Sequence, residues 1–237
     1  MKLGSTFSKV FLAVIVLFSI SGCKKESSQV GEAKVAVTDI DGNIYHSVTI
    51  GTQVWLVENL KTTRYRNGDR LLDVMVNGNW GKTWYGEYGW YNNDSVANKG
   101  VYGALYDFHA AIDNRGLAPI GWHVPTVIEW NTLRNYLTDS IAGTRLKESG
   151  TTHWKTPSGA YSNNSGTNST GFTALPGGIR SPNGLFSGIS YVGKWWAIEE
   201  VKLFTALTVE GMDSYYHDVS SVNEVENAGC SIRCIKD

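Results

Sequence analysis

Four groups of residues in this sequence carry side chains that could do chemistry. They are His123 with Glu129 in the stretch GWHVPTVIEWNTL, the adjacent Glu199 and Glu200, the pair Cys230 and Cys234, and the run Asn92-Asn93-Asp94. In that order they would suit acid–base work, glycoside hydrolysis, a disulfide bridge and a calcium site. Each group could instead have a purely structural role, and the spacing of the residues helps to decide between the chemical and the structural role.

The stretch GWHVPTVIEWNTL has the spacing of a helix start. Thr126 precedes Glu129 by three residues, which predicts a capping box in which each side chain binds the backbone N–H of the other residue. Val127, Trp130, Leu133 and Leu137 then form the apolar stripe of a helix. His123 lies before this helix, in a segment that Pro125 keeps extended, so a hydrogen-bonded packing role is favoured over a ligand role.

Hydrolase chemistry has no support in the sequence. Glu199 and Glu200 are adjacent, and neighbouring residues of a strand point to opposite faces, so the two carboxylates cannot flank one glycosidic bond. The motifs G-x-S-x-G, H-E-x-x-H and a phosphate-binding loop do not occur. We therefore expect a protein that is not an enzyme.

The cysteine and asparagine groups leave alternatives open. In one extended strand Cys230 and Cys234 would lie about 13 Å apart, too far for a disulfide, so a bridge requires a turn between them. An oxidising compartment nevertheless favours pairing of nearby cysteines. Asn92, Asn93 and Asp94 offer oxygen ligands for calcium but only one carboxylate, so turn capping is the favoured interpretation.

Composition indicates a globular domain and excludes nucleic-acid binding. The 237 residues are 42% hydrophobic and 18% charged, with a formal net charge of -1. Lysine and arginine are scattered along the chain, so no basic patch for DNA or RNA is present.

The first 36 residues predict a lipid-anchored envelope protein. Lys2 and Lys9 precede the apolar run from Val10 to Ile20, which is about half of the roughly 20 residues that a bilayer helix needs. Residues 1–22 are therefore expected to be a lipoprotein signal peptide, and the sequence ISGC resembles the bacterial lipobox with Cys23 as the lipidation site. The polar residues 23–36 read as a flexible tether. The expected location is the cell envelope, at the outer membrane, with the membrane as a partner through the anchor.

The rest of the chain predicts an α+β domain. Residues 44–50 alternate with period 2, which places Ile44, His46, Val48 and Ile50 on one face of a strand between two turns. Short helices are expected over 102–111 and 126–137, and short strands punctuated by glycine from Phe172 onward.

Aromatic residues mark the candidate ligand-binding positions. Residues 77–91 read NGNWGKTWYGEYGWY, too irregular for a helix or strand, and form a long loop that either covers the core or stacks on a ligand. Adjacent Trp195 and Trp196 must send one ring to each face of a strand, which predicts one core ring and one exposed ring. The candidates for ligand binding are Trp80, Trp84, Tyr88, Trp90, Trp195, Trp196 and Arg180.

Several motifs together resemble a known family. IGTQVWLVENLKTTRYRNG, YGALYDFHAA, GLAPIGWHVPTVIEW, GFTALPGGIR and SIRCIKD occur in this order. They resemble the Fibrobacter succinogenes major paralogous domain (FISUMP) family of Bacteroidetes and Fibrobacter lipoproteins, over residues 37–237. The family is in turn similar to the C-type lectin and sulfatase-modifying-factor superfold, which implies a C-type lectin-like α+β domain: an irregular antiparallel β-sheet with two short helices and long loops.

This chain departs from the family pattern at two places. Ala118-Pro119 stands where the family often has cysteine and proline, so a disulfide from that place to Cys234 cannot form. Residues 195–200 read WWAIEE where relatives tend to read W-W-S-S-T-E, which weakens a polar site built on those serines.

The function expected from these patterns is non-catalytic binding of an extracellular ligand, with a glycan favoured. The alternative is a structural or adhesive envelope subunit that binds protein partners. A third hypothesis is an enzyme resembling sulfatase-modifying factors, which would need a copper-binding cysteine pair. No cofactor is expected, apart from calcium as a weak candidate.

Overall fold

The computed structural model describes Met1 and residues 36–155, 166–199, 207–213 and 218–237. The predicted signal peptide, Cys23 with most of its tether, and Glu200 lie outside these residues. In the described part of the chain, no helix is long and apolar enough to span a bilayer.

The regular elements are short. The strands are β1 (Val37–Thr38), β2 (Ile44–Tyr45), β3 (Ser47–Ile50), β4 (Gln53–Leu56), β5 (Leu72–Asp73), β6 (Glu87–Gly89), β7 (Leu105–Tyr106), β8 (Trp122–His123), β9 (Ile179–Arg180), β10 (Phe186–Ser187), β11 (Val192–Ala197), β12 (Leu207–Asp213), β13 (Ser220–Glu224) and β14 (Ile235–Lys236). The helices are α1 (Ser95–Tyr102), α2 (Phe108–Ile112), α3 (Val127–Tyr136) and α4 (Ala142–Leu146), with 3-10 turns η1 (Asn77–Asn79), η2 (Tyr91–Asn93) and η3 (Asp139–Ile141).

The strands form several small sheets. The largest described sheet has the order β3-β4-β14-β8, two others have the orders β5-β6-β7 and β11-β12-β13, and β1-β2 and β9-β10 are separate two-stranded pairs. The strand pairs are antiparallel except β5 with β6, which is parallel. The prediction of an α+β domain with antiparallel sheets is confirmed.

The expected pair of short helices was wrong, because four α-helices lie within the described residues. The helix expected over 102–111 is in fact the end of α1, then β7, then α2. Gly103 ends α1 with a φ of 74°, and Leu105 pairs with Gly89 of β6, so the chain is extended there before Asp107 caps α2.

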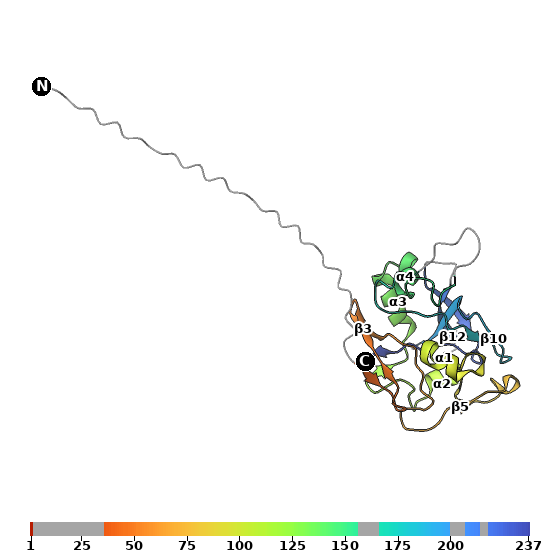
Figure 1. Ribbon diagram of the computed structural model, residues 1–237. Helices are drawn as coiled ribbons and strands as arrows, with labels where there is room; N and C mark the ends of the chain where they lie inside the picture. The colour runs from red at the N-terminus through yellow and green to blue at the C-terminus, as the bar shows by residue number, and fades with distance from the viewer. Residues whose placement is uncertain (2–35, 156–165, 200–206, 214–217) are drawn as a thin grey trace.

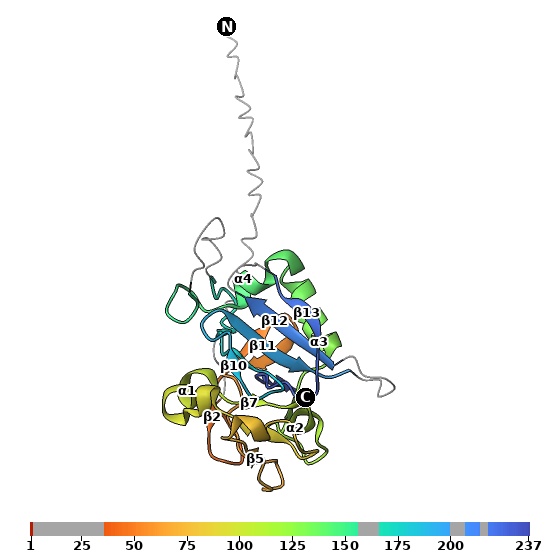
Figure 2. The same ribbon diagram turned by 90° about the vertical axis from the view of Figure 1, so that its right-hand side faces the viewer.

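Two apolar cores occupy the two halves of the domain. In both Figure 1 and Figure 2, α3 and α4 lie with β12 in one half, while α1, α2 and β5 lie in the other. Strand β11 runs between the cores, so Trp195 packs in the core with Trp130 while Trp196 packs in the other core with Tyr106. Both faces of this strand are therefore covered.

The alternation predicted for residues 44–50 holds only in part. Val48 and Ile50 are buried and Thr49 is exposed, as expected. Ile44 instead points to solvent and Tyr45 is buried. The face changes because β2 pairs with β1 whereas β3 pairs with β4 in a different sheet.

The capping box of α3 is confirmed. The Thr126 hydroxyl accepts the N–H of Glu129 at 3.2 Å, and the Glu129 carboxylate accepts the N–H of Thr126 at 2.7 Å. Trp130, Leu133 and Leu137 are buried, so the predicted stripe faces the core.

A buried arginine joins segments that are distant in sequence. Arg233 donates from Nε and Nη2 to Oδ1 of Asn59 at 3.0 and 2.7 Å, and from Nη1 to the carbonyl of Phe172 at 2.6 Å. Asn59 Oδ1 also accepts the indole N–H of Trp195 at 2.8 Å. Burial lowers the pKa of Arg233 to about 9, which leaves it protonated at neutral pH.

We predict that Arg233→Lys destabilises the fold by about 3 kcal/mol, because one ammonium group cannot serve the acceptors that the guanidinium fork reaches. The measurement is the free energy of unfolding in urea. Arg70→Lys, at an exposed arginine, is the control and should change stability by less than about 0.5 kcal/mol. Equal midpoints for the two variants would contradict the prediction.

Candidate ligand-binding loop

One loop exposes two neighbouring aromatic rings, one of them a tryptophan. Residues 81–86 connect buried Trp80 with β6, and they carry Trp84 at 81% exposure and Tyr85 at 68%. The other eight of the nine tryptophans are buried. Exposed tryptophan is costly in water, so this loop is the strongest candidate site for a ligand.

Both ends of the loop are held by hydrogen bonds. The buried Glu87 carboxylate accepts the N–H of Gly81 at 2.7 Å and the hydroxyl of Thr83 at 3.0 Å. The indole of Trp80 donates to the carbonyl of Asn227 at 2.7 Å, and the Asn227 side chain donates to the carbonyl of Gly81 at 3.1 Å. The loop therefore presents its rings on a fixed frame.

The loop also packs closely on α2. A Cβ at Gly86 would lie 2.0 Å from the Tyr65 hydroxyl and 2.7 Å from the Ala110 Cα, so only glycine fits there. The Trp84 ring meets the His109 ring of α2 edge-on, with the centroids 5.4 Å apart. One edge of Trp84 is thus supported while most of the ring faces solvent.

A second buried carboxylate couples the loop to α2. Asp107 Oδ1 accepts the N–H of Glu87 and the N–H of Ala110, both at 2.9 Å, and so caps α2. Its other oxygen is buried without a hydrogen-bond partner. Burial raises the pKa of Asp107 to about 7, and the charge of Glu87 adds to the shift against the backbone hydrogen bonds.

Three of the predicted aromatic candidates in this region are buried, which is the core-covering alternative for this stretch. Trp80 lies under the guanidinium of Arg180, 4.2 Å from ring centroid to Cζ. Tyr88 and Trp90 lie in and just after β6 and meet edge-on with centroids 5.6 Å apart. Because β6 is the middle strand of its sheet, these rings cover the core.

The three predicted candidates outside this loop region are also buried, so the exposed ring expected for the Trp195–Trp196 pair was wrong. Trp195 and Trp196 do point to opposite faces of β11, but neither is exposed, because a core lies on each side. Arg180 is fully buried and donates to the carbonyls of Gly184 and Val74 at 3.1 and 2.7 Å. Its guanidinium is occupied by the protein itself.

The weak calcium candidate has turn-capping contacts. Asp94 accepts the N–H of Ala97 at 3.0 Å and caps α1, and the Asn93 amide donates to the carbonyl of Met75 at 2.7 Å. Asn92 has a positive φ of 53° in the preceding turn. Among the described residues, no group of three or more His, Cys, Asp or Glu side chains is arranged to hold a metal.

The two cysteines are free thiols, so the candidate bridge between them does not form. Cys230 pairs through its backbone with Tyr106, and the carbonyl of Cys234 accepts the N–H of Leu56, which keeps the segment extended between two strands. Burial raises the pKa of both thiols above the usual range. An extended segment separates residues four positions apart by more than a disulfide spans.

His123 is a hydrogen-bonded residue of the scaffold, as predicted. Its Nε2 contacts the Glu129 carboxylate at 2.8 Å and its Nδ1 contacts the Asp237 carboxylate at 2.7 Å. Burial alone would lower the pKa of His123, but the two carboxylates outweigh it and raise the pKa above its ordinary value. His123 thus ties the last residue of the sequence to the start of α3.

The comparison with protein families gives one match. The model of the Fibrobacter succinogenes major domain matches residues 48–236. The chain belongs to this family. Neither the curated proteins nor the solved structures gave a match. Membership confirms the family resemblance of the sequence motifs and carries no activity with it.

Sequence reasoning missed the residues that frame the loop. Thr83 contacts Glu87 within the loop itself. Asp107 and His109 contact Glu87 and Trp84 from a segment that is distant in sequence, which no local spacing shows. The one available signal was the helix-start pattern of Asp107 three residues before Ala110, which marks an N-cap.

We predict that Asp107→Asn flattens the pH dependence of stability. A carboxyl whose folded-state pKa is raised contributes stability below its unfolded pKa, and this contribution, up to about 4 kcal/mol, is lost as the pH rises from about 4 to about 7. The amide keeps the Oδ1 acceptor and does not ionise. Unfolding in urea across this range is the measurement, with Asp94→Asn at the exposed N-cap of α1 as control. An unchanged slope in Asp107→Asn would refute the assignment.

The His123 contacts predict a second, smaller pH effect. Because its folded-state pKa is raised, the contribution is complete below about pH 6.5 and is lost as the pH rises through the raised value. His123 is partly exposed, so solvent screening limits the effect to less than about 1 kcal/mol. Thermal unfolding at about pH 6 and about pH 9 should show it. Asp237→Asn should remove part of this pH-dependent stability. If His123→Gln leaves the pH dependence of stability unchanged, His123 is not its source.

Proposed function

We propose that the protein is a lipid-anchored protein of the cell envelope whose domain, of the C-type lectin-like class, binds a glycan on Trp84 and Tyr85. The observation that carries this proposal is the exposure of these two neighbouring rings on a loop that is fixed at both ends. The domain keeps its other tryptophans inside.

A sugar is bound better by an aromatic loop that is already ordered than by a flexible loop. The C–H face of a pyranose ring packs on an indole, and the hydroxyl groups around it need polar neighbours. His109 supplies such a group beside Trp84, and Lys82 is exposed two residues earlier in the loop. Because the Glu87 carboxylate already orders the loop, little conformational entropy is lost when a ligand binds.

The rest of the proposal concerns place and cofactor. The lipobox at Cys23 supports an anchor in the outer membrane, with the domain outside the cytoplasm. Stacking on Trp84 needs no calcium. Asp94 Oδ1, which could bind the ion, already accepts the N–H of Ala97, and Asn93 Oδ1 is buried without a hydrogen-bond partner.

A protein partner is the second candidate, favoured by Ile112. This exposed side chain lies on α2 three residues after His109, on the side of the helix that meets Trp84. Aromatic rings next to an aliphatic side chain are typical of protein-binding hot spots. A sulfatase-modifying type of enzyme is third, and its cysteine pair would first have to be uncovered, since Cys230 and Cys234 are buried.

We predict that Trp84→Ala weakens glycan binding by about tenfold to a hundredfold, which corresponds to about 1–3 kcal/mol. The measurement is binding of the lipid-bearing protein in detergent to a panel of polysaccharides and host glycans, with calcium and with EDTA. Tyr136→Ala, at an exposed aromatic residue of α3, is the matched control and should bind as the wild type does.

Three outcomes of this panel are informative. Loss of binding with EDTA and with Asp94→Ala, but not with Trp84→Ala, would move the site to the calcium candidate. No binding to any glycan would refute the glycan proposal. Crosslinking of a protein partner that depends on Trp84 and Ile112 would then support the second candidate.

A further inference from the structure

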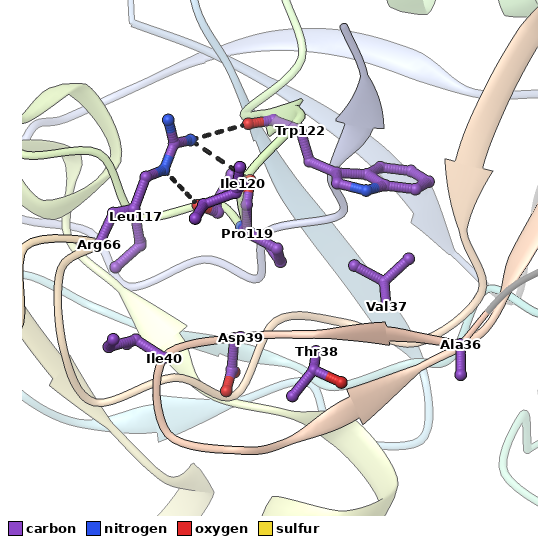
Figure 3. Close-up of a pocket in the computed structure, with 11 residues that line it drawn as sticks. Ala36, Val37, Thr38, Asp39, Ile40, Arg66, Leu117, Pro119, Ile120 and Trp122 are labelled. Carbon is purple, nitrogen blue, oxygen red and sulfur yellow. Dashed lines mark hydrogen bonds between the residues drawn. The ribbon is translucent and has the colours of Figure 1, made fainter.

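A pocket of about 400 Å³ lies between the β1–β2 hairpin and the segment before β8. Figure 3 shows side chains from the two segments on either side of it, among them Val37 from the hairpin and Leu117, Ile120 and Trp122 from the other segment. This pocket is separate from the residues of the aromatic loop.

The two charged side chains of the pocket lining, Arg66 and Asp39, already have hydrogen-bond partners within the protein. Arg66 donates to the carbonyls of Ala118, Pro119 and Trp122 at 3.1, 3.3 and 3.0 Å, as the dashed lines of Figure 3 show. The Asp39 carboxylate accepts hydrogen bonds from within the hairpin, including the Tyr45 hydroxyl at 2.6 Å. What the pocket offers to an occupant is therefore mainly hydrocarbon surface.

Ile40 and Ile120 line the pocket, Ile44 lies opposite the lining residue Thr38 in the hairpin, and all three are exposed. Ile120 is 82% exposed between Pro119 and Gly121, and Ile40 and Ile44, at 51% and 56%, lie at the tip and in the second strand of the hairpin. Isolated exposed aliphatic residues are ordinary, but a group of them around an apolar pocket marks a binding surface.

The position of Ala36 indicates that a membrane is the surface nearest to these isoleucines. Ala36, where the described domain begins, is itself part of the pocket lining. An extended chain from Cys23 to Ala36 reaches at most about 45 Å. This length is comparable with the diameter of a domain of this size, whose radius of gyration is roughly 16 Å. A lipid on Cys23 therefore keeps the membrane within reach of this face.

The acidic side chains at this face are buried or paired, including Asp237, which lies beside Gly121 and contacts His123 at 2.7 Å. Asp39 is buried, and Asp41 pairs with Arg64 at 3.1 Å. The Arg66 guanidinium and the Lys61 ammonium, which lies over the Tyr45 ring, add positive charge that suits anionic headgroups.

We propose that this face docks on the membrane that holds the anchor, with Ile40, Ile44 and Ile120 inserted among the lipid acyl chains. The inference rests on the proposed lipid anchor at Cys23 and is independent of the glycan proposal. It gives the domain a second membrane contact, and with it a fixed orientation.

The test places a polarity-sensitive fluorophore on single cysteines of the lipid-bearing protein in vesicles of phosphatidylethanolamine and phosphatidylglycerol. The native thiols Cys230 and Cys234 are fully buried, so they do not compete for the label. Ile120→Cys and Ile44→Cys report on the proposed face. Leu185→Cys, at 55% exposure, is the matched control for Ile44→Cys. It lies next to β10, which Figure 1 places on the opposite side of the domain from β3.

We expect the emission of labels 44 and 120 to shift to the blue in vesicles and to lose most of its intensity with acyl-chain quenchers, while label 185 stays as in water. If the protein binds vesicles but all three labels emit as they do in water, the docking proposal is wrong. The proposed lipid anchor is then unaffected. Failure of the protein to float with vesicles would overturn the anchor, and the docking with it. A blue shift that persists without vesicles and grows with protein concentration would assign the face to a second copy instead.

Discussion

Two buried arginines, Arg233 and Arg180, hold loops of this domain together. Neither forms an ion pair with a described carboxylate. Arg233 and Arg180 donate mainly to backbone carbonyls, and their guanidinium planes lie on aromatic rings. Short strands leave many loop carbonyls without a ladder partner, and a buried carbonyl without a hydrogen bond is costly. A guanidinium with five donors can satisfy several of them at one point, which is why arginine and not lysine occupies both places.

The aromatic loop depends on one of these arginines. Arg180 lies between the rings of Trp80 and Phe186, and Trp80 in turn holds Asn227, whose side chain binds the carbonyl of Gly81. Burial lowers the pKa of Arg180 to about 10, so the group stays charged at neutral pH and the stacking persists. The position of the exposed rings is thereby set by a contact in the core.

Two faces of the domain then have different chemistry. The aromatic loop combines exposed rings with polar neighbours and rests on two buried carboxylates, of which Asp107 changes protonation near neutral pH. The pocket beside Ala36 is mainly apolar and lies where the described domain begins. A protein held to a surface through one face and meeting a ligand with a separate loop is consistent with both proposals, and each can fail without the other.

Local patterns in the sequence determined only part of the local structure. The capping box of Thr126 and Glu129, the buried stripe of α3 and the α+β class follow from spacing, because hydrogen bonds and side-chain periodicity within a helix involve only near neighbours. Family membership could likewise be read from motif order. Only the tertiary structure decided which aromatic rings reach solvent. Trp84 and Trp196 are the same residue type, and one is exposed while the other is buried because two cores close around β11, a fact set by packing between segments distant in sequence.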